Sequence, residues 1–203
     1  MNKKWTLLGA ALLLIFSFNL KKDNPLLAFG EKAPMADQEM KSINGESYSL
    51  EDLKAENGLL VIFSCNTCPF VLGWEDRYPG LKKLADAQKI GMVLVNSNTK
   101  KREGDDSMSE MVKHAKEAGY TMPYVVDENN ALADAFGART TPHVFLFNGD
   151  LELVYRGSIN DKYENRSKEA EDEYLQKALK ALGSGAEIDP NDTRELGCSI
   201  KRS

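Results

Sequence analysis

The chain has 203 residues, of which 42% are hydrophobic and 28% are charged, and its formal net charge is −5. This length and composition are typical of one globular domain with appendages and exclude a chain that is disordered throughout. Loss of residues 1–20, which contain Lys3 and Lys4, changes the net charge from −5 to −7. Such acidity argues against nucleic acid or an anionic membrane surface as the partner.

The first twenty residues have the pattern of an export signal. A basic segment at 2–4 precedes an apolar run at 5–18 that is short for a membrane span. No clear small-residue cleavage site follows, so a cleaved signal peptide and a retained N-terminal membrane anchor both stay open. In both cases the protein is expected to be exported. It is then either periplasmic or anchored in the membrane and facing the periplasm or the extracellular side. The expected organisation is a signal or anchor at 1–20, a tether at 21–32, a domain at 33–182 and a C-terminal tail at 183–203.

Strand and helix patterns alternate along the expected domain. Asn44-Gly45 lies between two alternating segments and predicts a β-hairpin within residues 40–50. The continuous apolar runs at 59–63 and 90–95 predict strands buried on both faces of a sheet. Helical spacing predicts a helix over 66–87 with a kink at Pro79-Gly80. The remaining expected elements are helices over 107–118, 130–136 and 167–182 and strands over 124–127, 144–147 and 151–155.

The sequence also predicts which of several charged and aromatic side chains are exposed and which are buried. The charged run at 100–106 is interpreted as an exposed loop, although it follows the end of a strand, where open α/β sheets place their sites. His114 is expected on the surface. Trp74 and Tyr78 are expected in the core because of their helical spacing.

A Cys-x-x-Cys motif, Cys65-Asn66-Thr67-Cys68, joins the strand at 59–63 to the following helix. A thiol at the start of a helix lies among unpaired backbone N–H groups and at the positive end of the helix dipole, which lowers its pKa. We therefore expect Cys65 to be the exposed nucleophile and Cys68 to be the shielded thiol that resolves a mixed disulfide. An inert disulfide and half of a zinc site are the alternatives. The chain has no second Cys-x-x-Cys and no His-x-x-x-His to complete a zinc site.

The third cysteine, Cys198, lies in the polar tail. An odd cysteine in an exported protein suggests a spare thiol or pairing with another molecule. The chain takes sixteen steps from Leu182 to Cys198, a length that extends to roughly 50 Å and suffices to return to the active site. We hypothesise that Cys198 forms a disulfide with Cys65 or Cys68, as an extra resolving thiol or as a cap on the site.

The order of these elements resembles the thioredoxin fold of exported thiol–disulfide oxidoreductases and peroxiredoxins. This resemblance implies an α/β fold with a central mixed sheet flanked by helices, an N-terminal β-hairpin extension and a C-terminal tail. It also implies that Pro142 is a cis-proline facing the cysteines, that Thr141 and Pro142 bind substrate, and that His143 is a candidate accessory residue. The segments that resemble the peroxiredoxin-like branch are 63–71, 96–98, 136–138, 141–142, 155–157 and 197–201.

Two departures limit what the resemblance implies. Peroxiredoxins share a Pro-x-x-x-Thr-x-x-Cys pattern. When the pattern is counted back from Cys68, its proline and threonine positions hold Val61 and Cys65; counted back from Cys65, they hold Gly58 and Ile62. Thioredoxins carry a buried acid six residues before the first cysteine, where this chain has a leucine. Proton transfer to Cys68 must therefore use water or another group.

These observations favour a thiol–disulfide oxidoreductase that acts outside the cytoplasm. Its expected partners are protein or small-molecule disulfides or thiols and an electron-donor thiol protein, and neither a cofactor nor a metal is expected. One alternative is a thiol-dependent peroxidase. Another is a copper-binding or copper-delivery module, since two thiolates and His143 suit copper, although such modules usually separate their cysteines by three residues.

Overall fold

The structure is a computed structural model that describes residues 24–163 and 169–202. The expected signal or anchor at 1–20 lies outside the described residues. Within the described part of the chain, no helix combines the length and the hydropathy needed to cross a bilayer.

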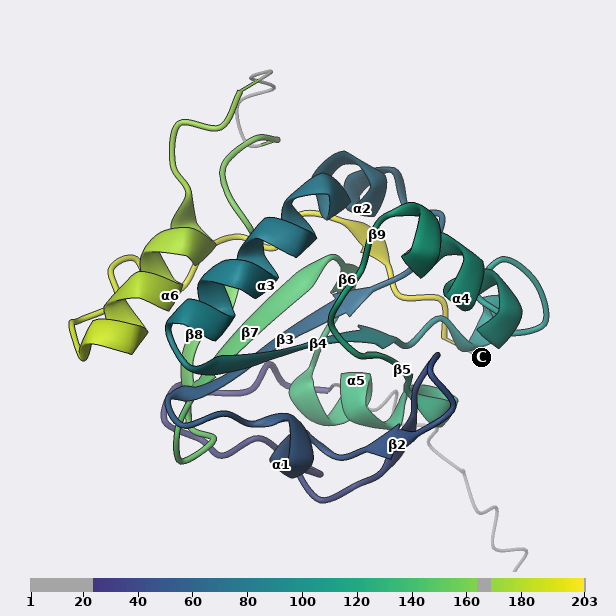
Figure 1. The fold of residues 1–203 in the computed structure, drawn as a ribbon, viewed down its shortest axis with the longest axis horizontal. Helices are drawn as coiled ribbons and strands as arrows, with labels where there is room; N and C mark the ends of the chain where they lie inside the picture. Colours follow the sequence, from purple (N-terminus) through teal and green to yellow (C-terminus); the bar gives the residue numbers. More distant parts are fainter. Residues whose placement is uncertain (1–23, 164–168, 203) are drawn as a thin grey trace, which may run out of the picture.

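A five-stranded mixed sheet forms the centre of the fold, in the order β5-β4-β3-β7-β8 (Figure 1). The central strand β3 (Gly58–Ser64) is parallel to β4 (Ile90–Asn96) and antiparallel to β7 (His143–Asn148). At the edges, β5 (Tyr124–Val126) runs parallel to β4, and β8 (Leu153–Gly157) runs antiparallel to β7. This topology confirms the predicted α/β class with a thioredoxin-like sheet.

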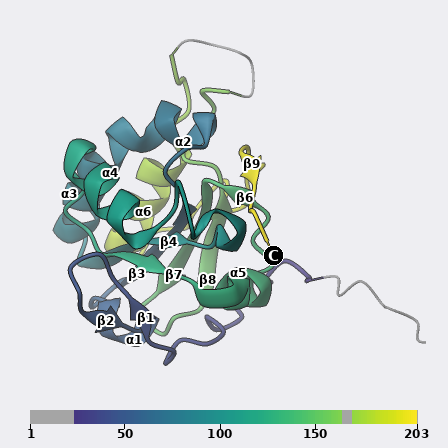
Figure 2. The ribbon, with the colours of Figure 1, turned by 90° about the vertical axis from the view of Figure 1, so that its right-hand side faces the viewer.

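Helices cover both faces of the sheet (Figure 2). Side chains on alternate positions of β3 enter the two cores, because successive residues of a strand point to opposite faces: Leu60 and Ile62 enter one core, and Val61 and Phe63 the other. The first face is covered by α2 (Pro69–Trp74), α3 (Tyr78–Ala87), α4 (Met108–Glu117) and α6 (Tyr174–Ser184). The second is covered by α1 (Leu50–Leu53), α5 (Ala131–Phe136) and the hairpin β1 (Met40–Lys41) and β2 (Ser47–Tyr48).

The predicted hairpin and core aromatic residues are confirmed. Met40 pairs with Tyr48 across the turn, where Gly45 has a φ of 88°. Trp74 and Tyr78 are fully buried on the α3 side of the sheet.

Some element boundaries differ from the prediction. The helix expected over 66–87 is interrupted by the 3-10 turn η1 (Glu75–Arg77), so the break precedes Pro79, which lies in the first turn of α3, where a missing N–H costs little. The last helix begins at Tyr174; the first residues expected in it, 167 and 168, lie outside the described residues. Strand β8 begins two residues late because Leu151 has a φ of 59° and continues the turn.

The described part of the expected tether packs on the domain. Leu27 is buried, its N–H donates to the carbonyl of Phe136 at 3.1 Å, and Gly30 N–H donates to the carbonyl of Leu153 at 3.0 Å. Residues 24–32 are therefore anchored to α5 and β8, so the expectation that this stretch is only a tether is wrong.

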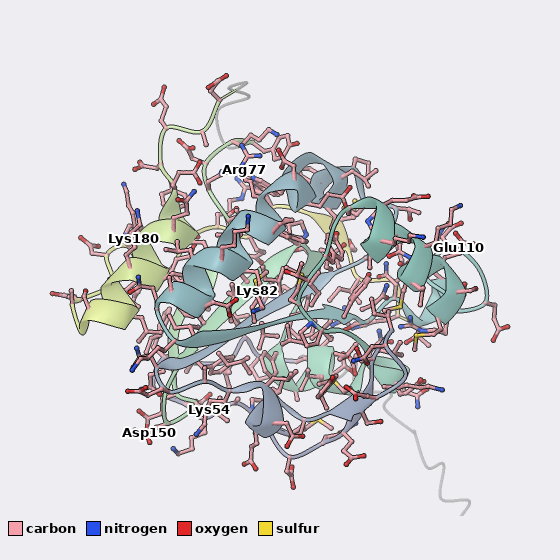
Figure 3. The ribbon with its side chains drawn as sticks, in the orientation of Figure 1. Lys54, Arg77, Lys82, Glu110, Asp150 and Lys180 are labelled. Carbon is pink, nitrogen blue, oxygen red and sulfur yellow. The ribbon has the colours of Figure 1, made fainter. Side chains whose placement is uncertain are left out.

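Charged side chains gather on the outside of the fold (Figure 3). Lys54 and Asp150 lie at one end of the sheet, where Lys54 Nζ donates to the carbonyl of Gly149 at 2.9 Å. Asp106 is the exception in the charged loop at 100–106, because it is fully buried beside the cysteines.

Candidate active site

The two cysteines of the motif lie in the turn from β3 into α2. Cys68 is the N-cap residue of α2, with Pro69 in the first helical turn. Cys65 and Cys68 are only 2% and 4% exposed. The expectation of an exposed Cys65 is therefore wrong for this structure, because Phe70 and the tail residue Cys198 pack against the turn.

Thr141 contacts both sulfurs. Its Oγ1 lies 3.3 Å from Cys65 Sγ, and its carbonyl accepts a hydrogen bond from Cys68 Sγ at 3.0 Å. The peptide bond between Thr141 and Pro142 is cis, as the resemblance implied. The fold thus brings the predicted substrate-binding dipeptide to the predicted catalytic cysteines.

The two thiols share a hydrogen bond and ionise as a pair. Hydrogen bonds from Cys65, from the Cys198 thiol and from the N–H of Val71 lower the pKa of Cys68, against the opposing effect of burial. Hydrogen bonding to Cys68, burial and the negative charge of Asp106 raise the pKa of Cys65. Because the two sulfurs are hydrogen-bonded to each other, they share one proton, and the hydrogen bond from Cys68 Sγ to the Thr141 carbonyl forms when that proton lies on Cys68.

A buried polar network that the sequence did not reveal holds the turn between the cysteines. Asp106 Oδ1 accepts hydrogen bonds from the backbone N–H of Asn66 at 2.9 Å and from Asn96 Nδ2 at 2.8 Å, and its Oδ2 accepts one from Asn98 Nδ2 at 3.0 Å. The Tyr124 hydroxyl donates to Asn66 Oδ1 at 3.0 Å. Because Asn66 lies inside the motif, this network fixes the backbone that carries both thiols.

The interpretation of the whole run 100–106 as solvated is therefore wrong for Asp106. The signal that pointed to it was position: the run follows β4, and the carboxyl ends of β3, β4 and β5 meet at one edge of the sheet.

His143 does not take part in the cluster of thiols. Its side chain is 1% exposed, its Nδ1 accepts a hydrogen bond from the backbone N–H of Arg139 at 3.3 Å, and its ring packs 4.5 Å from that of Phe145. Burial lowers the pKa of His143 to about 3, so the ring is neutral. These contacts give His143 a structural role and do not favour the accessory role considered from sequence. His114, expected on the surface, is instead mostly buried and bonded to Glu75 at 2.7 Å.

A cleft of about 200 Å³ opens over the cysteines. Lys101 and Lys201 give it a positive rim. Its other lining residues are Cys65, Thr67, Cys68, Asn98, Thr141, Cys198 and Ser199.

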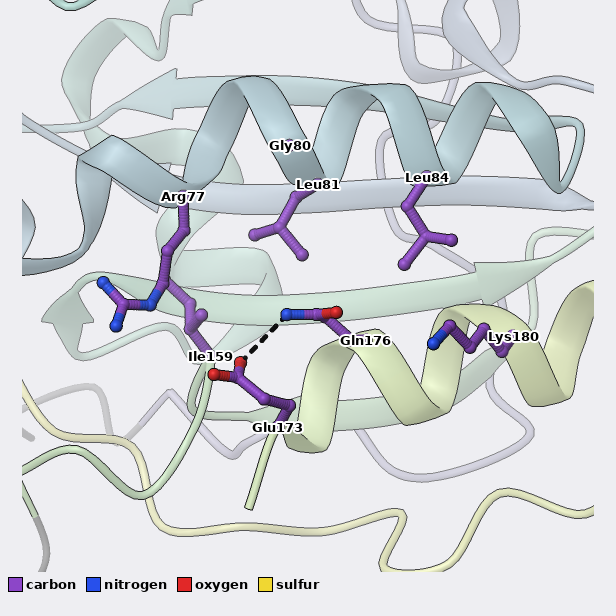
Figure 4. A pocket seen from close by; sticks show the side chains of 8 residues that line it. All are labelled: Arg77, Gly80, Leu81, Leu84, Ile159, Glu173, Gln176 and Lys180. Carbon is purple, nitrogen blue, oxygen red and sulfur yellow. Dashed lines mark hydrogen bonds between the residues drawn. The ribbon is translucent and has the colours of Figure 1, made fainter. Parts of the chain in front are cut away.

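A larger hollow of about 350 Å³ lies between α3 and α6 (Figure 4). Leu81 and Leu84 point into it, and Gln176 Nε2 donates to Glu173 at 3.1 Å on its opposite wall. None of its lining residues is a cysteine, so we place the thiol chemistry in the smaller cleft. Within residues 24–163 and 169–202, no group of three or more His, Cys, Asp and Glu side chains is arranged to hold a metal ion.

Comparison with known proteins identifies the family. The family model described as AhpC/TSA matches residues 29–156, which include Cys65, Cys68, Thr141 and Pro142 but not Cys198. The chain belongs to the AhpC/TSA family. Its membership confirms the predicted peroxiredoxin-like resemblance and places the chain among thioredoxin-like redox enzymes.

Solved structures are similar to this chain in fold. An uncharacterised conserved protein from Geobacillus kaustophilus is 32% identical, with a TM-score of 0.81 over 87% of this chain and 93% of that one. Two more distant structures share the fold. The peroxidoxin BcpB of Mycobacterium tuberculosis has 17% identity and a TM-score of 0.58 over 77% of this chain and 96% of that one. The thioredoxin domain of a thiol–disulfide oxidoreductase from Bacteroides vulgatus has 20% identity and a TM-score of 0.53 over 69% and 95%. A search of curated proteins found no match to this AhpC/TSA chain.

Proposed function

We propose that this AhpC/TSA protein is a thiol–disulfide oxidoreductase that uses Cys65 and Cys68 as its redox pair outside the cytoplasm. The observation that carries the proposal is the hydrogen-bonded pair of thiols at the start of α2, both in contact with Thr141. A lowered pKa at one thiol of such a pair supplies the thiolate that exchange with a disulfide requires.

The proposed reaction has two steps. Cys65 passes its proton to its hydrogen-bond partner Cys68 and attacks one sulfur of a substrate disulfide, so that a Cys65–substrate bond forms and the other substrate sulfur leaves as a thiolate. Cys68 gives its proton to that thiolate and attacks Cys65. The Cys65–substrate bond breaks, and the second substrate sulfur leaves with the electron pair. The substrate gains two electrons and the cysteine pair becomes a disulfide.

The proposed substrate is a protein or small-molecule disulfide. The backbone of Thr141 lies beside the cysteines, where an extended substrate segment would pair in place of the tail residue Cys198. A thiol protein then acts as the electron donor that reduces the Cys65–Cys68 disulfide. Export to the periplasm is supported by the basic and apolar pattern of residues 2–18.

A thiol-dependent peroxidase is the second candidate, and membership of the AhpC/TSA family favours it. The missing Pro-x-x-x-Thr-x-x-Cys pattern opposes it, because the residues that activate peroxide in peroxiredoxins are absent in either register. The third candidate, a copper module, has no supporting ligand cluster within the described residues.

The test compares disulfide reduction with peroxide consumption. The wild type should catalyse the reduction of insulin by dithiothreitol, and Cys65→Ser and Cys68→Ser should each lose this activity. The control Gly80→Ala changes an α3 position with open space around it and should retain full activity. Rapid peroxide consumption without insulin reduction would instead establish the peroxidase. A protein that shows neither of the two activities would overturn both candidates.

The location requires a separate test. Residues 1–33 fused to a reporter enzyme that folds only outside the cytoplasm should make it active in a bacterial host. A fusion in which the run at 5–18 is interrupted by two aspartates is the control. An inactive reporter in the first fusion contradicts export.

A further inference from the structure

The C-terminal tail occupies the strand position beside the cis-proline. Strand β9 (Cys198–Ser199) pairs antiparallel with β6 (Thr140–Thr141), so that Cys198 lies opposite Thr141 (Figure 2). Thr141 is also the residue that contacts both sulfurs of the motif. An extended substrate would pair with this same backbone. The tail therefore places a cysteine where a substrate cysteine is expected.

Contacts on the far side of β9 hold the tail in place. The N–H of Ile200 donates to the carbonyl of Arg139 at 3.0 Å, and the Ile200 side chain is buried in the α5 core. Lys201 N–H donates to Asn98 Oδ1 at 2.8 Å. Arg202 pairs with Asp134 at 2.9 Å. The position of Cys198 is thus fixed by the residues that follow it.

Gly197 permits the close approach of the tail. A Cβ atom at this position would lie 2.4 Å from the carbonyl oxygen of Thr141 and 2.7 Å from its carbonyl carbon. Because both are backbone atoms, a side chain at Gly197 cannot be accommodated by a rotamer change. The glycine next to Cys198 is therefore a requirement of docking.

The three sulfurs form one cluster. Cys198 packs against Cys65, Cys68 and Val71, and its thiol hydrogen-bonds to Cys68. Cys198 is partly exposed, whereas the other two cysteines are buried. A disulfide that includes Cys198 is thus more open to a large thiol protein than one between Cys65 and Cys68.

We propose that Cys198 is a third redox thiol, which takes the disulfide from the Cys65–Cys68 pair by attack on Cys68; this proposal rests on the oxidoreductase function proposed above. In this step the Cys68–Cys198 bond forms, the Cys65–Cys68 bond breaks, and Cys65 leaves with the electron pair and takes the proton of Cys198. No external oxidant is consumed. Cys65 becomes a thiol again, and the thiol protein that donates electrons reduces the new disulfide at the partly exposed Cys198.

The attack is directed to Cys68 and not to Cys65 because Cys68 is the hydrogen-bond partner of Cys198. Burial and the hydrogen bond to Cys68 raise the pKa of Cys198 to about 11, so Cys198 stays protonated in the reduced enzyme and leaves the thiolate to the Cys65–Cys68 pair. The relay therefore operates after Cys65 and Cys68 have become oxidised.

Disulfide mapping in variants in which one cysteine is replaced by serine tests the proposal. Cys65→Ser, oxidised at low protein concentration and digested without reduction, should yield an intramolecular Cys68–Cys198 disulfide. In Cys68→Ser the Cys65–Cys198 disulfide should form at least tenfold more slowly than the Cys68–Cys198 disulfide forms in Cys65→Ser. In a Cys65→Ser/Gly197→Ala double variant, which keeps both remaining cysteines, the rate of Cys68–Cys198 formation should fall at least tenfold. Cys65→Ser/Gly80→Ala is the matched glycine control and should retain the rate of Cys65→Ser.

Recovery of free Cys198, or of intermolecular dimers only, from folded Cys65→Ser overturns the relay. The same outcome beside a wild type that reduces insulin and forms a Cys65–Cys68 disulfide leaves the proposed function intact. A wild type that forms no reversible disulfide contradicts the proposed function itself. The two failures are therefore distinguished by the same mass spectra.

Discussion

At the scale of single residues, the chemistry depends on side chains that hold the thiols as much as on the thiols themselves. Asp106 is fully buried and accepts three hydrogen bonds, one of them from the backbone between the two cysteines. Removal of a buried acceptor leaves its hydrogen-bond donors unsatisfied in the protein interior, which costs free energy. Asp106 is thus a positioning residue for the Cys-x-x-Cys turn.

Replacing this carboxylate should destabilise the protein. We expect Asp106→Ala to lower the free energy of unfolding by about 2–4 kcal/mol, because three buried donors lose their acceptor. Chemical denaturation measures the change. The neighbouring Asp105→Ala is the matched control, since Asp105 makes an exposed ion pair with Lys101 and its loss should cost less than about 1 kcal/mol. Equal stabilities for the two variants would contradict the role of Asp106.

His143 predicts a pH dependence of stability. Burial lowers the pKa of His143 to about 3 from an ordinary value of 6.5. Between pH 6.5 and 3 the unfolded chain binds a proton that the folded protein does not, so stability falls as the pH falls, by up to about 1.4 kcal/mol per unit from this group. The stability is fully present above pH 6.5.

Denaturation at pH 7 and pH 5 compares the wild type with His143→Asn, which keeps an acceptor for the N–H of Arg139. The acid-induced loss should be smaller in this variant. His114→Asn removes the chain's other histidine and should retain the full loss. A loss that is unchanged in His143→Asn contradicts the buried neutral histidine.

At the scale of elements, features set by neighbouring residues can be predicted from the sequence, whereas features set by residues far apart in the chain cannot. Strands β3 and β4 were predicted because both runs are continuously apolar, as burial on two faces requires. The break at η1 was misplaced because Pro79 fits equally well inside a kinked helix or at the start of a new one. The motif was found because it is local, but Asp106 lies 40 residues from Asn66 and reaches it only through the sheet topology.

The burial of Cys65 was missed for a related reason, because it depends on a strand more than 100 residues away. Removing residues 197–203 should therefore increase the rate of alkylation of Cys65 and Cys68 in the reduced protein, by at least about tenfold, the factor that corresponds to a docking free energy of about 1.4 kcal/mol. Mass spectrometry of timed iodoacetamide labelling measures the rate. Circular dichroism checks that the shortened chain stays folded. An unchanged rate in a folded chain contradicts the covering role of the tail.

At the scale of the whole molecule, residues 24–32 and the C-terminal tail close the fold around the sheet. Residues 24–32 pack on α5 and β8. The tail runs beside β8, where Arg156 pairs with Asp192 at 2.7 Å, and continues to the cysteines. The family match ends at residue 156. The tail therefore adds a third thiol to a site whose other parts lie within the family's shared region.

The Cys65–Cys68 redox pair is tested by a redox titration of the purified protein in buffers of reduced and oxidised dithiothreitol, with the thiols trapped by acid and alkylation. We expect one reversible two-electron transition that joins Cys65 to Cys68 and is lost in Cys65→Ser, where any disulfide that forms includes Cys198. A wild type whose Cys65 and Cys68 remain free thiols at every ratio, while the protein stays folded, would contradict the proposed redox pair.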